Sequence, residues 1–263
     1  MPQNALLDSL PVVHSELVIL ADDRKTTVHV LRQPLRGTVV KVASLGSAKR
    51  VTDVCNELGG RVAAAISGGF FAREARQPLG ELWIAGTRQP YVPFQAPWHN
   101  IRGALHVGAD RITIDRRQML LEQPDGDLLQ AGPLLAMNGR PVTDLATDSE
   151  GFRAGSQQFD SDITDGRYPR AAIGYDDTYV YGVVVDGRTD GDVGMSLTEL
   201  ADFMTERLGV TAALNLDGGG SATLAARDPE GAFHVINNPM DSHNVPTPGG
   251  SRELYSAIVF TQL

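Results

Sequence analysis

Three consecutive glycines, Gly218–Gly220, lie between two apolar stretches of the chain, within the segment Asn215–Thr223. Because glycine loses the most backbone freedom on folding, such a run weakens any helix or strand that contains it. The segment is therefore expected to be a loop, and two interpretations fit it. In one, its backbone N–H groups and Ser221 hold an anion while Asp217 performs acid–base or nucleophilic chemistry. In the other, the run is a tight turn in which Asp217 bonds its own backbone.

The composition excludes several classes of protein. At 263 residues, with 42% hydrophobic and 21% charged residues, the chain is long enough to bury a substantial globular core. A formal net charge of −9 argues against binding of nucleic acid over a broad face, but it allows a small basic pocket for one phosphate. The 28 glycines and 15 prolines indicate many turns and a β-rich organisation.

The single cysteine, Cys55, excludes an intramolecular disulfide and is expected to be a buried thiol in a helix. No apolar run approaches the ~18 residues that span a bilayer. Residues 1–10 lack the pattern of an export signal. We therefore expect a soluble protein in the cytoplasm, without membrane association. The alternative is an exported protein whose signal segment is absent from this chain. The sequence contains no indication of oligomeric state.

Apolar periodicity predicts the main elements. Residues 17–42 alternate apolar and polar side chains and predict two or three strands, and residues 62–66 predict a buried strand. Ser47 is predicted to cap a helix that ends at Gly59 and carries Val51, Val54 and Leu58. Residues 144–167 are polar and without a clean period, and they are the best candidate for a long loop or lid over a site.

The clearest helix begins at Ser196 and is closed by Gly209, with one apolar face made of Leu197, Leu200, Ala201, Met204 and Leu208. Ser196 and Glu199 form the Ser-x-x-Glu pattern of a capping box, so Glu199 is assigned to helix capping rather than to catalysis. A short strand over residues 212–216 then leads into the glycine run.

These elements predict an α+β fold, a single domain with a mixed β-sheet core and few helices. The sequence shows no internal repeat, no low-complexity tract and no linker between domains. Residues 1–61 are expected to contribute N-terminal strands and a helix to the same domain, and residues 62–263 to form its larger part.

Charged residues gather at the ends of predicted strands, where a rigid scaffold can direct them into a cleft. Asp186 and Arg188 follow a strongly apolar strand, and Asp217 follows another. Arg170 opens a third strand, and Arg252 precedes the last one. Any one of these arginines is also compatible with a surface ion pair, which contributes little to stability. Their shared position beside glycine-bearing strand ends favours a common site.

The sequence argues against two other kinds of site. The histidines show no His-x-x-x-His or His-x-Glu pair, and Asp190 and Asp192 lack the remaining spacing of a calcium loop. We therefore expect no metal ion and no cofactor. Ser221 is not in the Gly-x-Ser-x-Gly elbow of serine hydrolases, because Thr223 occupies the last position.

The order of motifs from about residue 62 to the C-terminus is specific: Gly68-Gly69-Phe70-Phe71, Ala131-Gly132-Pro133-Leu134-Leu135, Arg170-Ala171-Ala172-Ile173-Gly174, Asp186-Gly187-Arg188, Gly194-Met195-Ser196, Asn215-Leu216-Asp217-Gly218-Gly219-Gly220-Ser221, Asn237-Asn238-Pro239 and Arg252. This series resembles the phosphodiester glycosidase family, which includes the lysosomal enzyme that uncovers mannose 6-phosphate by removing N-acetylglucosamine. The resemblance implies a hydrolase that cleaves the sugar C1–O bond of a glycosyl phosphodiester and releases free sugar and a phosphomonoester.

The chemistry of that reaction indicates what its site requires. The leaving group is a phosphate monoester with a second pKa of about 6, so it needs little protonation. Its growing charge must instead be held by arginine side chains and backbone N–H groups in a dry pocket. We expect Asp217 to be the base or nucleophile, with Asp186 and Arg188 completing the catalytic set, although Asp186 can instead orient an arginine. The residues expected to bind substrate or phosphate are Gly68, Gly69, Phe71, Arg170, Asn215, Gly218, Gly219, Gly220, Ser221 and Arg252.

This chain departs from the family pattern at three positions. Ser67 replaces the usual Asn before Gly-Gly-Phe-Phe, Ala72 replaces an acidic residue after it, and Ser251 replaces the Glu before Arg252. Ser67 and Ser251 support an alternative function, a non-catalytic protein that binds a sugar phosphate or nucleotide sugar on the same fold. The expected partner in either case is a small-molecule or glycan phosphodiester, rather than nucleic acid or a membrane.

Overall fold

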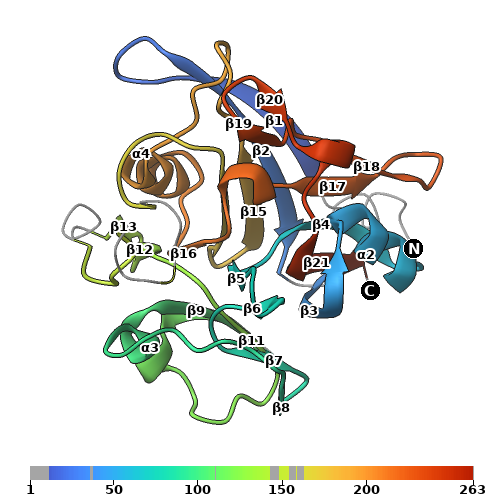
Figure 1. Ribbon diagram of the computed structural model, residues 1–263, viewed down its shortest axis with the longest axis vertical. Helices are drawn as coiled ribbons and strands as arrows, with labels where there is room; N and C mark the ends of the chain where they lie inside the picture. Colours follow the sequence, from blue (N-terminus) through green and yellow to red (C-terminus); the bar gives the residue numbers. More distant parts are fainter. Residues whose placement is uncertain are drawn as a thin grey trace.

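Two large antiparallel sheets pack face to face in the computed structural model, which describes residues 12–35, 38–109, 111–142, 148–153, 158 and 163–262 (Figure 1). The seven-stranded sheet has the order β1 (Val12–Ile19), β2 (Lys25–Pro34), β15 (Tyr179–Val185), β14 (Arg170–Tyr175), β16 (Ala212–Asn215), β12 (Leu134–Met137), β13 (Arg140–Pro141). The five-stranded sheet opposite it has the order β18 (Phe233–Val235), β17 (Leu224–Arg227), β4 (Val62–Ser67), β21 (Leu254–Gln262), β3 (Thr38–Lys49).

The main core lies between these sheets. Side chains of successive strand residues point to opposite faces, so each strand divides its apolar residues between two layers. Ile173 and Leu214 of the seven-stranded sheet cluster with Ile66, Ile258 and Phe260 of the other sheet, and all are fully buried. Burial of side chains of this size is the dominant stabilising contribution to such a fold.

Helices cover the two outer faces. The helix α4 (Leu197–Asp202) continues as a π-helical turn, η2 (Phe203–Arg207), and buries Leu200 and Met204 against Val183 of the seven-stranded sheet. The helix α2 (Val51–Leu58) buries Val54 and Cys55 against the outer face of the five-stranded sheet. The result is four layers, helix, sheet, sheet and helix, as Figure 1 shows from α4 to α2.

A third, smaller sheet has the order β10 (Ile112–Arg116), β9 (Gly103–Val107), β11 (Asp127–Gln130), β7 (Leu82–Ile84), β8 (Thr87–Arg88). With the short helix α3 (Trp98–Ile101) it forms the lower part of the molecule in Figure 1. It joins the main core through Leu82, Leu105 and Leu129. Two hairpins, β5 (Phe71–Ala72) with β6 (Gln77–Pro78) and β19 (Met240–Ser242) with β20 (Val245–Pro246), project beside the large sheets.

The prediction of a β-rich core with few helices is confirmed. Where we expected a mixed sheet, all ladders between named strands in the described part of the chain are antiparallel. The N-terminal strands β1 and β2 belong to the seven-stranded sheet, and β3 belongs to the five-stranded sheet. No helix among the described residues combines the length and apolar content needed to cross a membrane.

The two helix predictions had different outcomes. The capping box is confirmed, because the Ser196 side chain accepts a bond from the Glu199 amide and the Glu199 side chain accepts one from the Ser196 amide. The cap at Ser47 is wrong, because β3 pairs with β21 as far as Lys49 and therefore contains Ser47. The helix α2 begins at Val51, and its N-cap residue makes no side-chain capping bond.

Candidate active site

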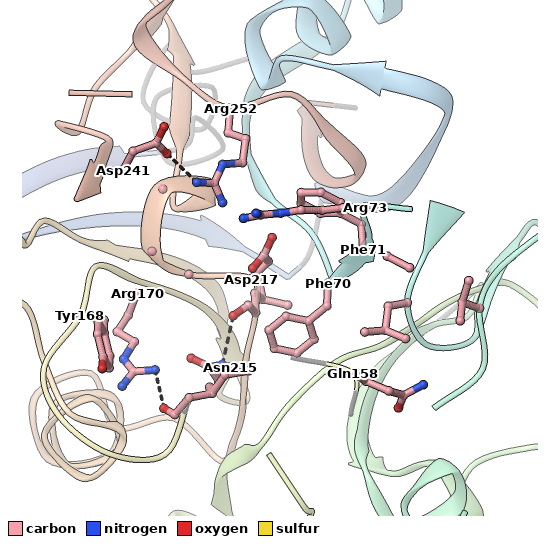
Figure 2. A pocket seen from close by; sticks show the side chains of 18 of the residues that line it. Phe70, Phe71, Arg73, Gln158, Tyr168, Arg170, Asn215, Asp217, Asp241 and Arg252 are labelled. Carbon is pink, nitrogen blue, oxygen red and sulfur yellow. Dashed lines mark hydrogen bonds and ion pairs between the residues drawn. The ribbon is translucent and has the colours of Figure 1, made fainter. Parts of the chain in front are cut away.

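A cavity of about 740 Å³ opens where β16 and the β5–β6 hairpin approach each other (Figure 2). The described residues that line it are Phe70, Phe71, Ala72, Arg73, Glu74, Leu79, Val92, Gln95, Gln158, Ile163, Tyr168, Arg170, Arg188, Asn215, Leu216, Asp217, Gly218, Gly219, Gly220, Asp241 and Arg252. Of the predicted loop over 144–167, Gln158 and Ile163 line this cavity, while residues 144–147, 154–157 and 159–162 lie outside the described residues.

Asp217 lies at the junction of the two large sheets. Its amide donates to the Gly68 carbonyl at 3.0 Å, and its own carbonyl accepts from Ser67 Oγ at 3.3 Å. Both partners lie at the end of β4, so the loop after β16 is tied to the opposite sheet. Figure 2 shows the Asp217 carboxylate pointing toward the side of the cavity that carries Arg73 and Arg252.

The environment of Asp217 raises the pKa of its carboxyl toward neutral pH. Loss of hydration in the cavity raises the pKa of the carboxyl from 3.8 to about 6. A hydrogen bond from Ser221 and the positive charges of Arg252 and Arg73 oppose this shift. The carboxyl is half-buried, lines the cavity and is predominantly ionised at pH 7, which are the properties of a general base or nucleophile.

The glycine run is both a tight turn and part of the cavity wall. Gly219 has a φ of +59° and begins a short 3₁₀ turn, Gly219–Ser221, while its amide donates to the Pro169 carbonyl at 2.8 Å. In the described part of the chain, the amides of Gly218 and Gly220 donate to no protein acceptor. Two backbone donors at the wall of a basic cavity are suited to an anion.

A side chain at position 220 would displace an ion pair. A Cβ there would lie 2.1 Å from Asp241 Oδ1 and 2.5 Å from Arg252 Nη2. These two atoms are themselves paired at 2.5 Å, and Arg252 Nη1 also donates to Ser221 Oγ at 3.4 Å. The missing side chain therefore allows an ion pair to pack directly on the loop that follows Asp217.

Arg188 lies beside the same loop and is held in place by backbone carbonyls. Its Nη1 donates to the carbonyls of Met240, at 3.1 Å, and Asp241. Burial, first, and the neighbouring charge of Arg252, second, lower the pKa of the Arg188 guanidinium, so the two arginines repel each other. A bound anion would relieve this repulsion. The aromatic ring of Tyr168 lies 5.8 Å from the Arg188 guanidinium.

Arg170 is more deeply buried and largely engaged by the protein. Its guanidinium donates to the carbonyls of Met195 at 2.9 Å, Ile163 at 3.0 Å and Gly166 at 3.2 Å, and it lies 5.3 Å from the Tyr168 ring. It lines the cavity, but these bonds fix the wall formed by 163–168. Arg170 therefore contributes positive charge to the site and holds its shape.

Three predicted substrate-binding residues are committed to the protein. The amides of Gly68 and Gly69 donate to the carbonyl and hydroxyl of Ser256, at 3.2 and 3.0 Å, so neither is available to a phosphate. Asn215 lines the cavity, yet its Nδ2 donates to the carbonyls of Gly132 and Leu216 at 2.9 and 3.0 Å. Phe71 lines the cavity and packs on Tyr255, with 5.5 Å between ring centroids.

Asp186 does not line the cavity. It is buried, and its carboxylate bonds His29 Nε2 at 2.9 Å and accepts from the Asn238 amide at 2.8 Å. His29 in turn bonds the hydroxyl of Ser15 at 2.7 Å. Asp186 thus lies behind the segment that carries Arg188 and connects it to β2. Its geometry is that of a positioning residue.

Sequence reasoning missed five cavity residues that carry charge or an aromatic ring: Phe70, Arg73, Glu74, Tyr168 and Asp241. Arg73 directly follows the Gly-Gly-Phe-Phe motif, which is the only signal that could have identified it. Tyr168, which lies between Arg170 and Arg188, and Asp241, which pairs with Arg252, had no local signal. Among the residues that the structure describes, no group of three or more His, Cys, Asp or Glu side chains is arranged to hold a metal ion.

The fold resembles several solved structures. The catalytic domain of zebrafish N-acetylglucosamine-1-phosphodiester alpha-N-acetylglucosaminidase, auto-inhibited by its pro-peptide, matches with a TM-score of 0.67 at 19% identity, over 96% of this chain and 83% of that one. A hypothetical protein from Synechocystis matches with a TM-score of 0.62 at 19% identity. The match covers 95% of this chain but only 62% of the Synechocystis protein. A Burkholderia pseudomallei protein described as exported matches with a TM-score of 0.62 at 16% identity, over 91% of this chain and 74% of that one.

At these identities the likeness to solved structures shows the fold alone. Direct comparison with curated protein sequences finds no match. Because one of the similar structures is described as an exported protein, the cytoplasmic location of this chain stays a prediction. The family model described as phosphodiester glycosidase matches residues 60–261, which contain every motif from Gly68-Gly69-Phe70-Phe71 to Arg252. This match covers more than three quarters of the sequence, and the chain therefore belongs to the phosphodiester glycosidase family.

Proposed function

We propose that this protein hydrolyses a glycosyl phosphodiester at the sugar C1–O bond, releasing free sugar and a phosphomonoester. The observation that carries the proposal is the cavity itself. It combines one carboxyl whose pKa is raised to about 6, Asp217, with arginine side chains and two unengaged backbone amides. This is the inventory that departure of a phosphate requires.

The phosphate would bind on the side of the cavity formed by the glycine run and Arg252, with Arg73 and Arg188 contributing positive charge. Hydrogen bonds from ionised donors to phosphate oxygens are stronger than neutral ones, and their strength increases where water is excluded. As the C1–O bond breaks, its electron pair moves to the phosphate oxygen. The amides of Gly218 and Gly220 are then available to stabilise that charge without rearrangement.

Asp217 would act at the sugar carbon, either as the base that takes a proton from the attacking water or as the nucleophile itself. In the first case the water oxygen bonds C1 while the phosphate leaves, and the proton passes to the carboxylate. In the second, the carboxylate oxygen bonds C1, and water then hydrolyses the glycosyl ester. Both routes require the ionised carboxylate, which its pKa of about 6 provides at neutral pH.

The substrate classes that fit this proposal are sugar nucleotides, teichoic-acid-like polymers and glycosylated nucleotide metabolites. The half-buried rings of Tyr168 and Phe71 and the buried ring of Phe70 lie on the remaining walls, where a sugar ring would be placed. A cytoplasmic location, which is part of the same proposal, favours a small soluble phosphodiester over a cell-wall polymer.

The test is incubation with a panel of glycosyl phosphodiesters, with and without EDTA, followed by mass spectrometry of the products in ¹⁸O-labelled water. We expect free sugar carrying the label at C1 and an unlabelled phosphomonoester, in both conditions. Label in the phosphate, or release of sugar 1-phosphate, would show cleavage at phosphorus and would contradict the proposal. Asp217→Asn should lower kcat about a thousandfold. Asp177→Asn, in the exposed turn between β14 and β15, should leave kcat unchanged.

Binding of the same compounds without any product would support the alternative, a protein that binds a sugar phosphate or nucleotide sugar and does not turn it over. In that case Asp217→Asn should leave the affinity unchanged. Arg252→Ala should weaken binding under either function, because the phosphate contacts are shared.

A further inference from the structure

A second groove, of about 600 Å³, lies on the small sheet, between β7 and β8, the segment 91–100 and the turn after β10. It is separate from the candidate active site, although the two share one wall. Val92 and Gln95 line the active-site cavity, whereas Tyr91, Pro93 and Phe94 line the groove. The two spaces therefore lie on opposite sides of the same short segment.

The groove contains a buried arginine whose charge is already balanced. Arg117 is 8% exposed, and its Nε and Nη2 bond the two carboxylate oxygens of Glu81. Its remaining donors bond the carbonyls of Leu121, at 2.9 Å, and Glu122, at 3.0 Å. Because its donors are engaged and its charge is neutralised, Arg117 is poorly suited to bind a phosphate or carboxylate. The groove therefore favours a ligand without charge.

The same carboxylate fixes an aromatic ring. The indole N–H of Trp83 donates to Glu81 Oε1 at 2.8 Å, which sets the orientation of a half-buried ring in the groove wall. Tyr91, also half-buried, lies in the same wall. The Cζ of the exposed Arg88 lies 5.7 Å from the centroid of the Trp83 ring, which is within the range of a cation–π contact.

Three carboxamide side chains line the same groove. Asn100, Gln118 and Gln123 are exposed in the groove and make no side-chain hydrogen bond within the described part of the chain. Each offers a donor and an acceptor. Gln130, in the same groove, is a contrast, because its Nε2 donates to the His99 carbonyl at 2.6 Å and its Oε1 accepts from the Glu81 amide. Apart from the exposed side chains of Arg88, His99 and Glu122, the available polar groups are therefore carboxamides, which can both donate and accept.

We infer that this groove binds a neutral saccharide. A pyranose ring has an apolar C–H face that stacks on an aromatic ring, and hydroxyls that donate and accept in the way a carboxamide requires. It carries no charge, which matches the neutralised Arg117–Glu81 pair. The volume lies within the range of small-ligand sites. The inference depends on the residues of the groove alone, and it holds whether or not the neighbouring cavity is catalytic.

Fluorescence gives a direct test, because Trp83 and Trp98 are the only two tryptophans of the chain. Neutral trisaccharides of glucose, mannose and N-acetylglucosamine would be titrated, together with inositol hexakisphosphate and a proline-rich peptide. We expect at least one saccharide to change the emission with a dissociation constant in the millimolar range. The change should persist in Trp98→Phe and disappear in Trp83→Phe.

Calorimetric titration of the same saccharide would locate the site independently of the tryptophans. Gln118→Ala and Tyr91→Ala should weaken binding about tenfold. Arg252→Ala, in the other cavity, should leave it unchanged. Absence of binding by all saccharides, wild-type affinity in both groove variants, loss of binding in Arg252→Ala, or binding of only the peptide or the polyphosphate would each overturn the inference. The experiment measures binding and not turnover. A failure of the proposed hydrolysis can therefore be distinguished from a failure of saccharide binding in the groove.

Discussion

The amide of Asp217 donates to the carbonyl of Gly68 at 3.0 Å, so the proposed catalytic carboxyl is joined by its own backbone to the end of the opposing sheet. The two residues are 149 positions apart in the sequence and lie on loops after β16 and β4. Because both strands are buried in the core, the position of the carboxyl is fixed by the packing of the two sheets. This relationship places the chemistry on rigid elements and makes several consequences testable.

Asp217→Asn should change stability in a pH-dependent way. The folded-state pKa of Asp217 is raised from 3.8 to about 6, so the folded protein binds more protons than the unfolded chain within that window. This carboxyl therefore lowers the stability of the wild-type protein as pH rises from about 4 to about 6, and the loss persists above pH 6. Relative to wild type, Asp217→Asn should gain about 1–3 kcal/mol at pH 8 and almost nothing at pH 3.

Urea denaturation at the two pH values measures this difference. The same variant should lose about a thousandfold in kcat, the magnitude typical of a lost base or nucleophile. Equal stability of the two proteins at pH 8 would contradict the raised pKa, even if activity were lost.

Arg73→Ala should move the acidic limb of the pH–activity profile to higher pH. The positive charge of Arg73 opposes the effect of burial on Asp217, so its removal raises the pKa of the carboxyl further. The measurement is kcat/KM between pH 4 and pH 8. Arg73→Lys keeps the positive charge and should give a profile close to that of the wild type. Arg61→Ala, which changes an exposed arginine away from the cavity, should leave the profile unchanged.

Gly220→Ala should impair the site through sterics alone. Its Cβ would meet Asp241 Oδ1 at 2.1 Å and Arg252 Nη2 at 2.5 Å, so the ion pair must separate or the loop must move. We expect a rise in KM and a fall in kcat of about tenfold, together with a loss of less than about 1 kcal/mol of stability, because the two side chains that must move are partly exposed. Gly191→Ala is the matched control, because a Cβ there meets one atom, at 4.0 Å. Activity equal to that of the control would mean that the loop is adaptable.

Asp186→Asn should separate positioning from catalysis. The buried carboxylate bonds His29 and the Asn238 amide but does not line the cavity, so its amide replacement weakens these bonds without removing a reacting group. We expect a loss of about 2 kcal/mol of stability and measurable residual activity. Turnover as low as that of Asp217→Asn, at full stability, would instead place Asp186 in the chemistry.

Ser196→Ala should reduce stability and leave kinetics unchanged. The variant removes one half of the capping box at the start of α4, which corresponds to about 1 kcal/mol. Thr198→Ala, exposed in the first turn of the same helix, is the control and should change stability little. A fall in kcat for Ser196→Ala, without a fall in the free energy of unfolding, would show that the assignment of Glu199 to capping is incomplete.

Much of the fold could be predicted from local pattern. The strand over 62–66 and the helix that begins at Ser196 depend on periodicity and capping within a few residues, and both are present. The assignment of Ser47 as a helix cap was wrong because the residue lies in a strand. The pairing of β3 with β21, which are more than two hundred residues apart in the sequence, decided its conformation. The antiparallel arrangement of the sheets is equally a matter of long-range pairing.

The sequence by itself determined the family, the β-rich core and the special character of the segment around Asp217, because glycine runs, strand patterns and motif order are local properties. The tertiary structure decided which charges share a cavity. It places Arg73 and Arg252 close enough to Asp217 to oppose the rise of its pKa, and it pairs Arg252 with Asp241. It also commits the Gly68 and Gly69 amides to Ser256 and removes Asp186 from the cavity. Such assignments depend on distances across two packed sheets, which no pattern along the chain contains.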